Sequence, residues 1–425
     1  RRLYGLGSDG AETSSAPAES QGSSSQSSEQ AAEPAEEITL RLTWWGSQVR
    51  HDDTIAVTEL YTEKNPNIKF QCEFMGGSDY WQKLNTFVAA NDMPDVFQVG
   101  NNFRTYQSAI EPLEPYVESG VLDLSDADET FLLPTTVDGQ LLGVSLGTNA
   151  YCMIYDPAIF EQAGVPEPTD DWTWDDFEQA CYQINEKLGI YGTGDIGFWN
   201  MVCYIMQHGE DYTIYNADGT ALGYTDDSIV TDFFDMKRRL IDTTGVYPTP
   251  DILASIKDTQ SDLIVSGQAA ISWQASNLYS AICEVAQRPL KIAPYPKLTA
   301  DGPSGMFVRN SQAFCISNNS DYKEEGAKFI SFFVNDLEAN DILNGERGVP
   351  IMSKVREHLA SKADDVVKAT YDYMDKIGEI ASHQMPAEPS GQIELEDACK
   401  RINEELAFGR ISPEEAAAEF RSEAE

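Results

Sequence analysis

The chain has 425 residues, 41% of them hydrophobic. This is enough for two substantial cores, because single hydrophobic cores stop growing at about 250–300 residues. With 70 Asp and Glu residues against 29 Lys and Arg residues, the formal net charge is −41, which excludes nucleic acid and anionic lipid as favoured partners. The charge favours a neutral or cationic ligand, unless the acidity serves only to keep the protein in solution.

Residues 1–37 differ in composition from the rest of the chain. Between Ser8 and Glu37 they are mostly Ser, Ala, Glu, Gln and Gly, with no basic and no large apolar residue. Such a segment cannot bury enough surface to offset its ordering entropy, so we expect a disordered Ser/Glu-rich tether. We expect neither a membrane span nor the apolar region of a signal peptide in the sequence given. A tether of this kind is typical of surface lipoproteins and predicts a lipid anchor outside this sequence. A generic disordered tail is the alternative.

The segment ITLRLTWW predicts a strand whose end faces a ligand. Apolar residues from Ile38 to Trp44 alternate with polar ones, so Trp44 should point inward. Trp45 has the opposite parity just before Gly46, and its ring should emerge at the carboxyl end, where open α/β sheets bind ligands. Ordinary core packing of Trp45 is the alternative.

Further candidate ligand residues follow along the chain. Gln48, Arg50 and His51 lie in the predicted loop after the first strand, where Arg50 and His51 can also brace the next helix. That helix is expected over about 54–64, followed by an alternating strand over 68–74 and, after a Gly-Gly turn, a helix that carries Tyr80. A buried parallel strand over 96–99 then delivers Asn101 to the same edge as Trp45, although Asn is also favoured in turns.

Several segments, taken in this order, resemble the extracellular solute-binding proteins of ABC sugar importers, of the oligosaccharide-binding type related to maltose-binding protein. They are WWGSQVRHD, YTEKNPNIKF, YWQKLNTFVAANDMPDVFQV, VDGQLLGVSLGTNAYCMIYDPAIFEQAGVPEP, TWDDFEQA, SDLIVSGQAAISWQASN and GERGVPI. The resemblance covers about residues 38–425. It implies a class II periplasmic-binding-protein-like α/β fold with two lobes, each a mixed sheet flanked by helices, and a carbohydrate in the cleft between them.

The resemblance also implies that the chain crosses between the lobes more than once. The expected parts are a first lobe over 38–148 and 296–340 and a second lobe over 149–295 and 341–425. The extended run from Val144 to Tyr155, interrupted at Gly147, is typical of such a crossing and would place Asn149 at the floor of the cleft. The Pro/Gly-rich segment 291–305 predicts the second crossing. The strand over 311–320 and the helix over 324–336 would then return to the first lobe.

The second lobe should supply matching ligand residues. The acidic start of the helix near Thr173 makes Trp172 and Trp174 packing residues. Trp199 lies at the predicted start of the next helix and can face the cleft. A short strand over 269–272 is followed by Trp273 and Asn277, which repeats the pairing of an indole with an amide.

An indole beside amides is suited to a sugar, because the C–H face of a pyranose stacks on an aromatic ring while its hydroxyls need directional partners. Arg347, in the loop GERGVPI, can reach the cleft or pair with Glu346 instead. Core packing is the alternative for Trp199, Trp273 and Tyr80 as well.

We expect no metal, cofactor or catalytic site. The seven cysteines form no CxxC pair and the four histidines form no ligand cluster, so the cysteines are expected to be buried thiols. The sequence contains no nucleophile elbow, phosphate-binding loop or dinucleotide fingerprint, and the glycines from Tyr191 to Gly197 are interpreted as a turn.

The sequence therefore predicts a monomeric, extracellular oligosaccharide-binding protein that delivers its ligand to an ABC permease. It would be a cell-surface lipoprotein of a Gram-positive bacterium. A secreted glycan-degrading enzyme, or the same fold binding a peptide, polyamine or metal chelate, are the alternatives.

Overall fold

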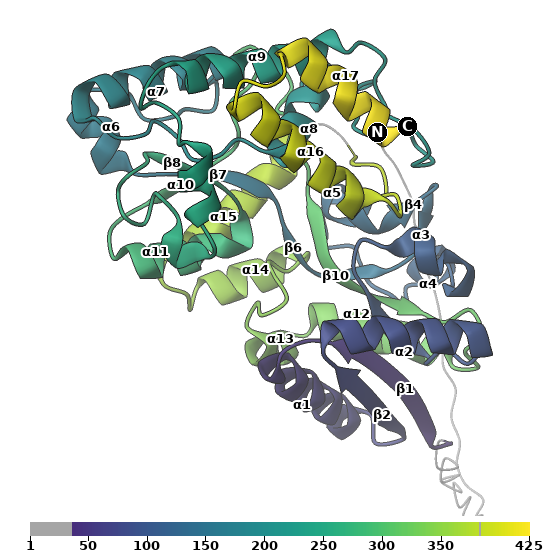
Figure 1. Cartoon of the computed structure of the whole chain (residues 1–425). Coiled ribbons are helices and arrows are strands. Elements are labelled where there is room, and N and C mark those ends of the chain that lie inside the picture. Colours follow the sequence, from purple (N-terminus) through teal and green to yellow (C-terminus); the bar gives the residue numbers. More distant parts are fainter. Residues whose placement is uncertain (1–35, 382–383) are drawn as a thin grey trace, which may run out of the picture. The chain divides into compact units, whose positions relative to one another are not determined.

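The computed structural model describes residues 36–381 and 384–425. The chain divides into two units, residues 1–36 and 37–425, and the fold described below is that of the second unit. The predicted tether lies, apart from its last two residues, outside the described residues. Two sheets organise the second unit, and we call each sheet with its helices a lobe (Figure 1).

The first lobe is built on a five-stranded sheet in the order β2-β1-β3-β10-β6. Its strands are β1 (Ile38–Trp45), β2 (Ile68–Met75), β3 (Val96–Val99), β6 (Val144–Asn149) and β10 (Arg309–Ile316). β1 runs parallel to β2 and β3, while β10 runs antiparallel to β3 and β6. The carboxyl ends of β1 and β3 therefore meet at one edge of the sheet.

Helices cover both faces of this sheet. The alternation along β1 turns Leu40, Leu42 and Trp44 toward the face on which α1 and α12 pack, whereas α2 and α3 pack on the opposite face (Figure 1). The helices of this lobe are α1 (Gln48–Lys64), α2 (Gly77–Ala90), α3 (Phe103–Tyr106), α4 (Glu114–Glu118), α5 (Glu129–Leu132), α12 (Lys323–Asn335) and α13 (Leu337–Leu343). A short hairpin of β4 (Thr136–Val137) and β5 (Gln140–Leu141) precedes β6.

The chain crosses from the first sheet to the second at Ala150. β6 ends at Asn149, and Tyr151 begins β7, the central strand of an antiparallel sheet in the order β8-β7-β9. This sheet consists of β7 (Tyr151–Tyr155), β8 (Ile271–Ala275) and β9 (Lys291–Ala293). Ala150 is thus the single residue between the two sheets, within the run of residues 144–155 whose pattern, interrupted at Gly147, is typical of a crossing.

The strand expected over 269–272 is shifted in the structure. β8 begins at Ile271 and continues to Ala275, and Trp273 pairs in register with Met153 of β7. The prediction that Trp273 follows the strand is wrong, because the central strand β7 provides hydrogen-bonding partners beyond Ser272.

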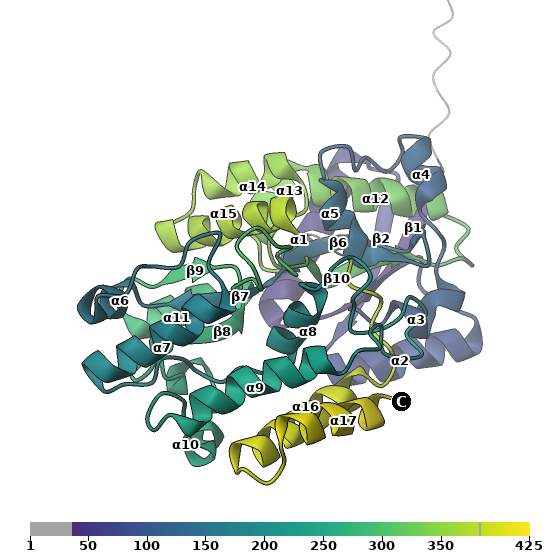
Figure 2. The same cartoon turned by 90° about the horizontal axis from the view of Figure 1, so that it is seen from above.

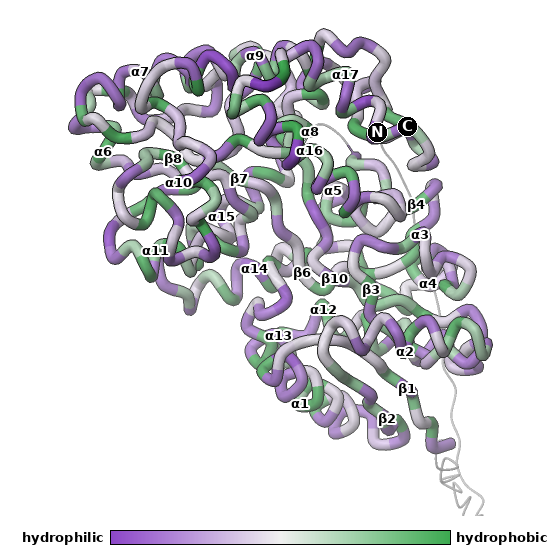
Figure 3. Tube along the Cα trace, viewed as in Figure 1, coloured by the Kyte–Doolittle hydropathy of each residue, from purple (hydrophilic) through white to green (hydrophobic). Residues whose placement is uncertain are grey.

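Helices surround the second sheet. They are α6 (Pro157–Ala163), α7 (Trp174–Leu188), α8 (Phe198–Met206), α9 (Ser228–Asp242), α10 (Pro250–Ser255), α11 (Tyr279–Ala286), α14 (Ser353–Ala360), α15 (Asp365–Ile380), α16 (Gln392–Ala407) and α17 (Pro413–Ala424). α16 and α17 lie beside α9 (Figure 2). Along α7 and α9, hydrophobic residues alternate with hydrophilic ones, as expected of helices with one buried face (Figure 3).

Local signals explain how α7 begins. Thr173 and Asp176 form a capping box, in which each side chain accepts a hydrogen bond from the backbone of the other. Trp174, directly after the cap, is only 4% exposed, which confirms its predicted packing role.

The expected lobe boundary at residue 340 stays a prediction. The expected boundary at residue 340 falls inside α13, which packs against α1 of the first lobe and against α14.

Candidate functional site

Two adjacent tryptophans end β1 and face opposite ways. Trp44 is fully buried and its Nε1–H donates to Nδ1 of His51 at 3.1 Å, which confirms that Trp44 points inward. Trp45 is half-buried on the other face, where its ring centroid lies 4.8 Å from that of Trp81 and 5.3 Å from that of Tyr80. The carboxyl edge of the sheet thus presents a pair of indoles from β1 and α2.

The segment after Trp45 is helical rather than a loop. Ser47 caps α1, and its hydroxyl accepts from the backbone N–H of Arg50, so the helix starts six residues earlier than the expected Thr54. Gln48 therefore lies in the first turn, exposed, and its amide donates to Asp52 at 2.8 Å. Arg50 makes a two-point contact with Glu346, with Nε 2.9 Å from Oε2 and Nη2 3.0 Å from Oε1.

Three predicted ligand residues are buried within the first lobe. His51 is held by Trp44, and the hydroxyl of Tyr80 donates to the carbonyl of Gln98 at 2.6 Å. Arg347 is 3% exposed and donates to the side chains of Gln98 and Thr54. Its burial lowers the pKa of Arg347 to about 9. Burial leaves these three side chains no open face toward a ligand in this conformation, because the packing of α1, α2 and β3 needs them.

The exit of β3 joins Trp45 to the second lobe. A Cβ placed on Gly100 would lie 3.9 Å from the Cη2 atom of Trp45, so the indole rests against this glycine. The next residue, Asn101, donates to the carbonyl of Asn310 at 3.2 Å. Asn101 also lines a small cavity of about 30 Å³ together with Arg309 and residues 385–388.

Arg309, the first residue of β10, connects Asn101 to aromatic residues of the second lobe. Its Nη1 donates to the hydroxyl of Tyr151 at 2.7 Å and its Nη2 donates to Glu388 at 2.8 Å. The guanidinium carbon lies 4.6 Å from the ring centroid of Trp199 and 5.1 Å from that of Tyr151. The two rings stack on each other with centroids 4.7 Å apart. Arg309 therefore lines one small cavity with Asn101 and also contacts Trp199.

Asn149 lies at the crossing between the sheets, opposite Arg309 in the register of β6 and β10. Its Nδ2 donates to the hydroxyl of Ser311 at 2.9 Å. Its Oδ1 is buried and has no hydrogen-bond partner within the described residues. Leaving such an acceptor unpaired costs about 1–3 kcal/mol, so this oxygen is a candidate for a contact with a ligand donor.

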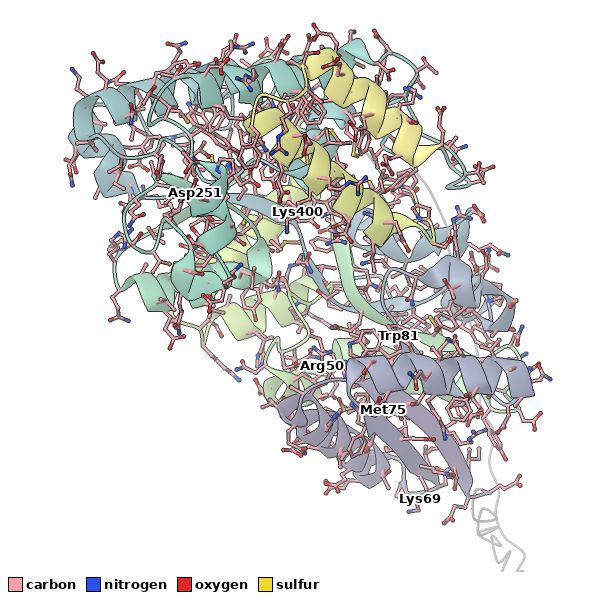
Figure 4. The ribbon with its side chains drawn as sticks, in the orientation of Figure 1. Arg50, Lys69, Met75, Trp81, Asp251 and Lys400 are labelled. Atoms are coloured by element: carbon pink, nitrogen blue, oxygen red, sulfur yellow. The ribbon has the colours of Figure 1, made fainter. Side chains whose placement is uncertain are left out.

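A larger pocket of about 740 Å³ opens beside Trp199. Its walls come from the start of α8, from α10 and the turn after it, and from α16. Asp251 on α10 and Lys400 on α16 are labelled in Figure 4. Asp195 and Trp199 both line this pocket. This volume suits a small organic ligand of a few rings.

Two predicted residues lie away from this arrangement. Trp273 packs against Trp174, Phe177 and Tyr295, and its Nε1–H donates to Thr193 at 2.8 Å. Asn277 is exposed and lines a separate pocket of about 290 Å³ near Thr148. A role of Trp273 or Asn277 in ligand contact stays a prediction, and neither lines the pocket at Trp199.

Four residues that the structure places here are not predicted by the sequence pattern: Trp81, Tyr151, Asp195 and Arg309. Trp81 adjoins the predicted Tyr80, and helical periodicity alone does not decide which of two neighbouring aromatic residues is buried. Arg309 lies two residues before the predicted strand, so its position near the predicted crossing is a signal that points to it.

The described ranges contain no group of three or more His, Cys, Asp or Glu residues that could hold a metal ion. The seven thiols are free, five of them buried and Cys72 and Cys283 half-buried. None of the helices within these ranges has the length and apolarity needed to traverse a bilayer.

A family model of bacterial extracellular solute-binding proteins matches residues 56–370, and the chain belongs to this family. Binding proteins of Brucella abortus (strain 2308) and Brucella suis biovar 1 (strain 1330) are each 25% identical over 295 residues, which cover 67% of this chain and 69% of theirs. The family binds substrates rather than transforming them, and it acts outside the cytoplasm.

Solved structures of similar fold include three solute-binding proteins. A family 1 extracellular solute-binding protein from Alicyclobacillus acidocaldarius has a TM-score of 0.81 at 24% identity, covering 92% of this chain and 98% of that one. A periplasmic oligogalacturonide-binding protein from Yersinia enterocolitica has a TM-score of 0.78 at 22% identity, covering 91% and 97%. An ABC substrate-binding protein from Listeria monocytogenes, in complex with cycloalternan, has a TM-score of 0.67 at 21% identity, covering 91% and 98%. The predicted two-lobed α/β fold is confirmed.

Proposed function

We propose that this protein binds an oligosaccharide between its two lobes and delivers it to the membrane permease of an ABC importer. The observation that carries the proposal is the series of neighbouring groups in which Trp45 rests against Gly100, Asn101 lines one small cavity with Arg309, and Arg309 lies over Trp199. It alternates indoles with amide and guanidinium groups along the edge of one sheet and into the other lobe.

This combination of groups suits a glycan. Indole faces stack on the apolar C–H faces of sugar rings, and the amides and charged groups bond the hydroxyls. A buried hydroxyl without a partner would cost about 1–3 kcal/mol, so polar groups among the aromatic ones are needed. The unpaired Oδ1 of Asn149 is buried in this conformation and would accept from such a hydroxyl once a movement of the lobes uncovers it. The names of two structural neighbours, which bind oligogalacturonide and cycloalternan, point in the same direction.

Capture by two lobes makes the protein a switch. A ligand shifts an equilibrium between open and closed forms only by its differential affinity for them, so contacts from both lobes are required. The single residue between β6 and β7, Ala150, and the irregular segment between β9 and β10 are the proposed hinges. The closed form would be the one that the permease recognises. We further propose that the protein acts as a monomer held at the cell surface by a lipid anchor.

A thermal-shift screen with a panel of oligosaccharides tests the binding proposal. A ligand present at about 100 times its dissociation constant stabilises the native state by about 2.7 kcal/mol, which raises the melting temperature measurably. If no oligosaccharide shifts the melting temperature but a peptide or polyamine does, the protein binds that other class of solute and not a sugar. Shortened products after incubation with a bound glycan would show hydrolysis instead.

A further inference from the structure

The pocket beside Trp199 contains a carboxylate that is held in place by buried groups. The 740 Å³ space is lined by Asp195, Gly197, Phe198, Trp199 and Lys237, by Tyr247 and residues 250–257, and by residues of α16. Asp195 is the acidic residue nearest in sequence to the indole of Trp199. Its side chain is 48% exposed, so part of the carboxylate is open to the pocket.

Lys237 fixes Asp195 and has no further capacity for a ligand. Its ammonium group is fully buried and lies 3.0 Å from Oδ1 of Asp195, 2.6 Å from the carbonyl oxygen of Ile196 and 2.6 Å from Oδ1 of Asn403. An ammonium group has three donors, and these three acceptors use all of them. Lys237 therefore orients the carboxylate but cannot also bond an acidic ligand.

Tyr247 holds the same carboxylate oxygen from a second side. Its hydroxyl donates to Oδ1 of Asp195 at 2.5 Å and accepts from the backbone N–H of Ile196 at 2.6 Å. No hydrogen bond to the other oxygen, Oδ2, is present among the described residues. A carboxylate with one oxygen anchored and the other free is preorganised to accept from a hydroxyl, because little side-chain freedom remains to be lost on binding.

The other charges around the pocket disfavour an acidic ligand. Asp251, Glu396 and Glu404 line it together with Lys257 and Lys400, which are exposed. With Asp195 neutralised by Lys237, three acidic groups thus face two cationic ones. This local excess of negative charge is in line with the net charge of −41 for the whole chain.

We propose that Asp195 and Trp199 form a subsite that selects neutral sugars over acidic ones. The inference rests on the proposed function, and it names the substrate class of the part of that site that the second lobe supplies, because every residue that lines the pocket belongs to that lobe. The indole supplies a stacking surface, and Oδ2 of Asp195 accepts from a ring hydroxyl. A sugar that carries a carboxylate, such as a uronic acid, is disfavoured because Asp251, Glu396 and Glu404 outnumber the exposed Lys257 and Lys400, and the buried Lys237 has no free donor.

Calorimetric titration of the whole chain tests this subsite. The probes are maltotriose, cellotriose, xylotriose and mannotriose as neutral sugars and trigalacturonic acid as the acidic one. We expect a neutral trisaccharide to bind and trigalacturonic acid to bind at least roughly 10-fold more weakly. Asp195→Asn should weaken the neutral sugar roughly 10- to 100-fold, the range for a hydrogen bond to a charged group.

Two further variants serve as a control and as a substitute in case Asp195→Asn does not fold. Asp242→Asn, which removes a carboxylate of α9 that pairs with Arg238 and lines none of this pocket, should leave the affinity unchanged. If Asp195→Asn alone does not fold, Asp195→Asn/Lys237→Gln removes both charges of the buried pair, and it should show the same loss of affinity. The melting temperature without ligand verifies that each variant is folded.

The outcomes separate this inference from the proposed function. Tight binding of trigalacturonic acid, or a neutral sugar whose affinity is unchanged by Asp195→Asn, would overturn the subsite and leave sugar binding in place. If none of the five glycans binds, sugar binding fails and the subsite fails with it.

Discussion

The guanidinium of Arg309 lies over the indole of Trp199, with Cζ 4.6 Å from the ring centroid. Arg309 begins β10 in the first lobe, and Trp199 lies in the first turn of α8 in the second. An arginine over an indole contributes about 0.5–2 kcal/mol, depending on how far water is excluded. Glu388 forms an ion pair with the same guanidinium, and the hydroxyl of Tyr151 accepts a hydrogen bond from it. These two partners fix the position of Arg309, on which its contact with Trp199 depends.

We therefore expect Arg309→Ala to reduce both stability and ligand affinity. The substitution removes the ion pair with Glu388, the hydrogen bond to Tyr151 and the stacking on Trp199. Both partners of the ion pair are 21% exposed, so the loss should be about 1–3 kcal/mol rather than that of a fully buried pair. Urea unfolding monitored by tryptophan fluorescence measures it.

Arg41→Ala is the matched control for this arginine. Arg41 pairs with Asp92 at 2.7 Å, but its side chain is 33% exposed and that of Asp92 is 63% exposed. An exposed pair of this kind contributes about 0–1 kcal/mol. Equal losses from the two variants would mean that Arg309 acts as an ordinary surface arginine.

The sequence pattern predicted the order of the elements better than it predicted the site. Alternation along 38–45 and 144–155 identified strands, and the parity of Trp44 and Trp45 was sufficient to separate their faces. These features depend on neighbours along the chain. The pairing of Arg309 with Tyr151 and Trp199 depends on two sheets coming together, which no local period reveals.

Some ligand residues are predicted from their chemical type alone, and the structure buries them in tertiary packing. Their contact with a ligand stays a prediction. Arg347 lies in a segment, GERGVPI, that the sequence predicts to be a loop. Its guanidinium is nevertheless enclosed by α1 and β3 and lies 5.6 Å from the ring centroid of Phe314. His51 belongs to a helix that Ser47 starts earlier than the apolar pairs indicated. Buried polar groups find hydrogen-bond partners that are far apart in the sequence. Residue type alone therefore does not predict which polar residues are buried.

The two indoles Trp45 and Trp273 should now give different results when replaced. Trp45 is half-buried at the sheet edge, so Trp45→Ala should weaken sugar binding by about 1–3 kcal/mol, by analogy with stacking of bases on aromatic side chains. Trp273 packs among three aromatic rings and donates to Thr193, so Trp273→Ala should cost about 3 kcal/mol of folding stability.

Calorimetry with the bound sugar and thermal unfolding without it separate these two effects. If Trp273→Ala unfolds like the wild type but loses sugar affinity, Trp273 contacts the ligand. If Trp45→Ala binds the sugar with unchanged affinity, Trp45 does not contact the ligand.

Acidification should destabilise the start of α1 through His51. Burial, and next to it the charge of Arg50, lowers the pKa of His51 below 6.5. Nδ1 of His51 accepts a hydrogen bond from Nε1–H of Trp44. Protonation of Nδ1 would make it a donor as well, so the two N–H groups would face each other and the hydrogen bond would be lost. Since the unfolded state then binds more protons than the native state, the contribution is fully present above about pH 6.5 and is lost as the pH falls through the lowered pKa.

The difference between the wild type and His51→Gln isolates this effect. The charged groups Asp52, Asp53, Glu346 and Arg347 act on or near the ring, and they are the same in both proteins. Urea unfolding between about pH 5 and 7.5 should show a wild-type stability that falls toward acid more steeply than that of the variant. Parallel curves would mean that His51 does not titrate in this range.

The last prediction concerns the close approach of two backbone segments at the crossing. A Cβ on Gly147 of β6 would lie 2.2 Å from the carbonyl oxygen of Arg347 and 2.8 Å from the Cα of Gly348. These are backbone atoms of a segment that pairs with Thr148 through Val349, so they cannot move aside without breaking those hydrogen bonds. Gly147→Ala should therefore cost at least about 1–3 kcal/mol and displace the strand that carries Asn149.

Gly77→Ala is the control for this glycine. A Cβ there meets no atom within 4 Å, and the residue is the first of α2, so alanine should leave the stability unchanged or raise it by less than about 1 kcal/mol. Urea unfolding of both variants, followed by sugar titration of the folded ones, measures the two consequences together. If Gly147→Ala has the stability and sugar affinity of the wild type, the backbone near Arg347 is free to shift, and β6 does not hold Asn149 rigidly at the crossing.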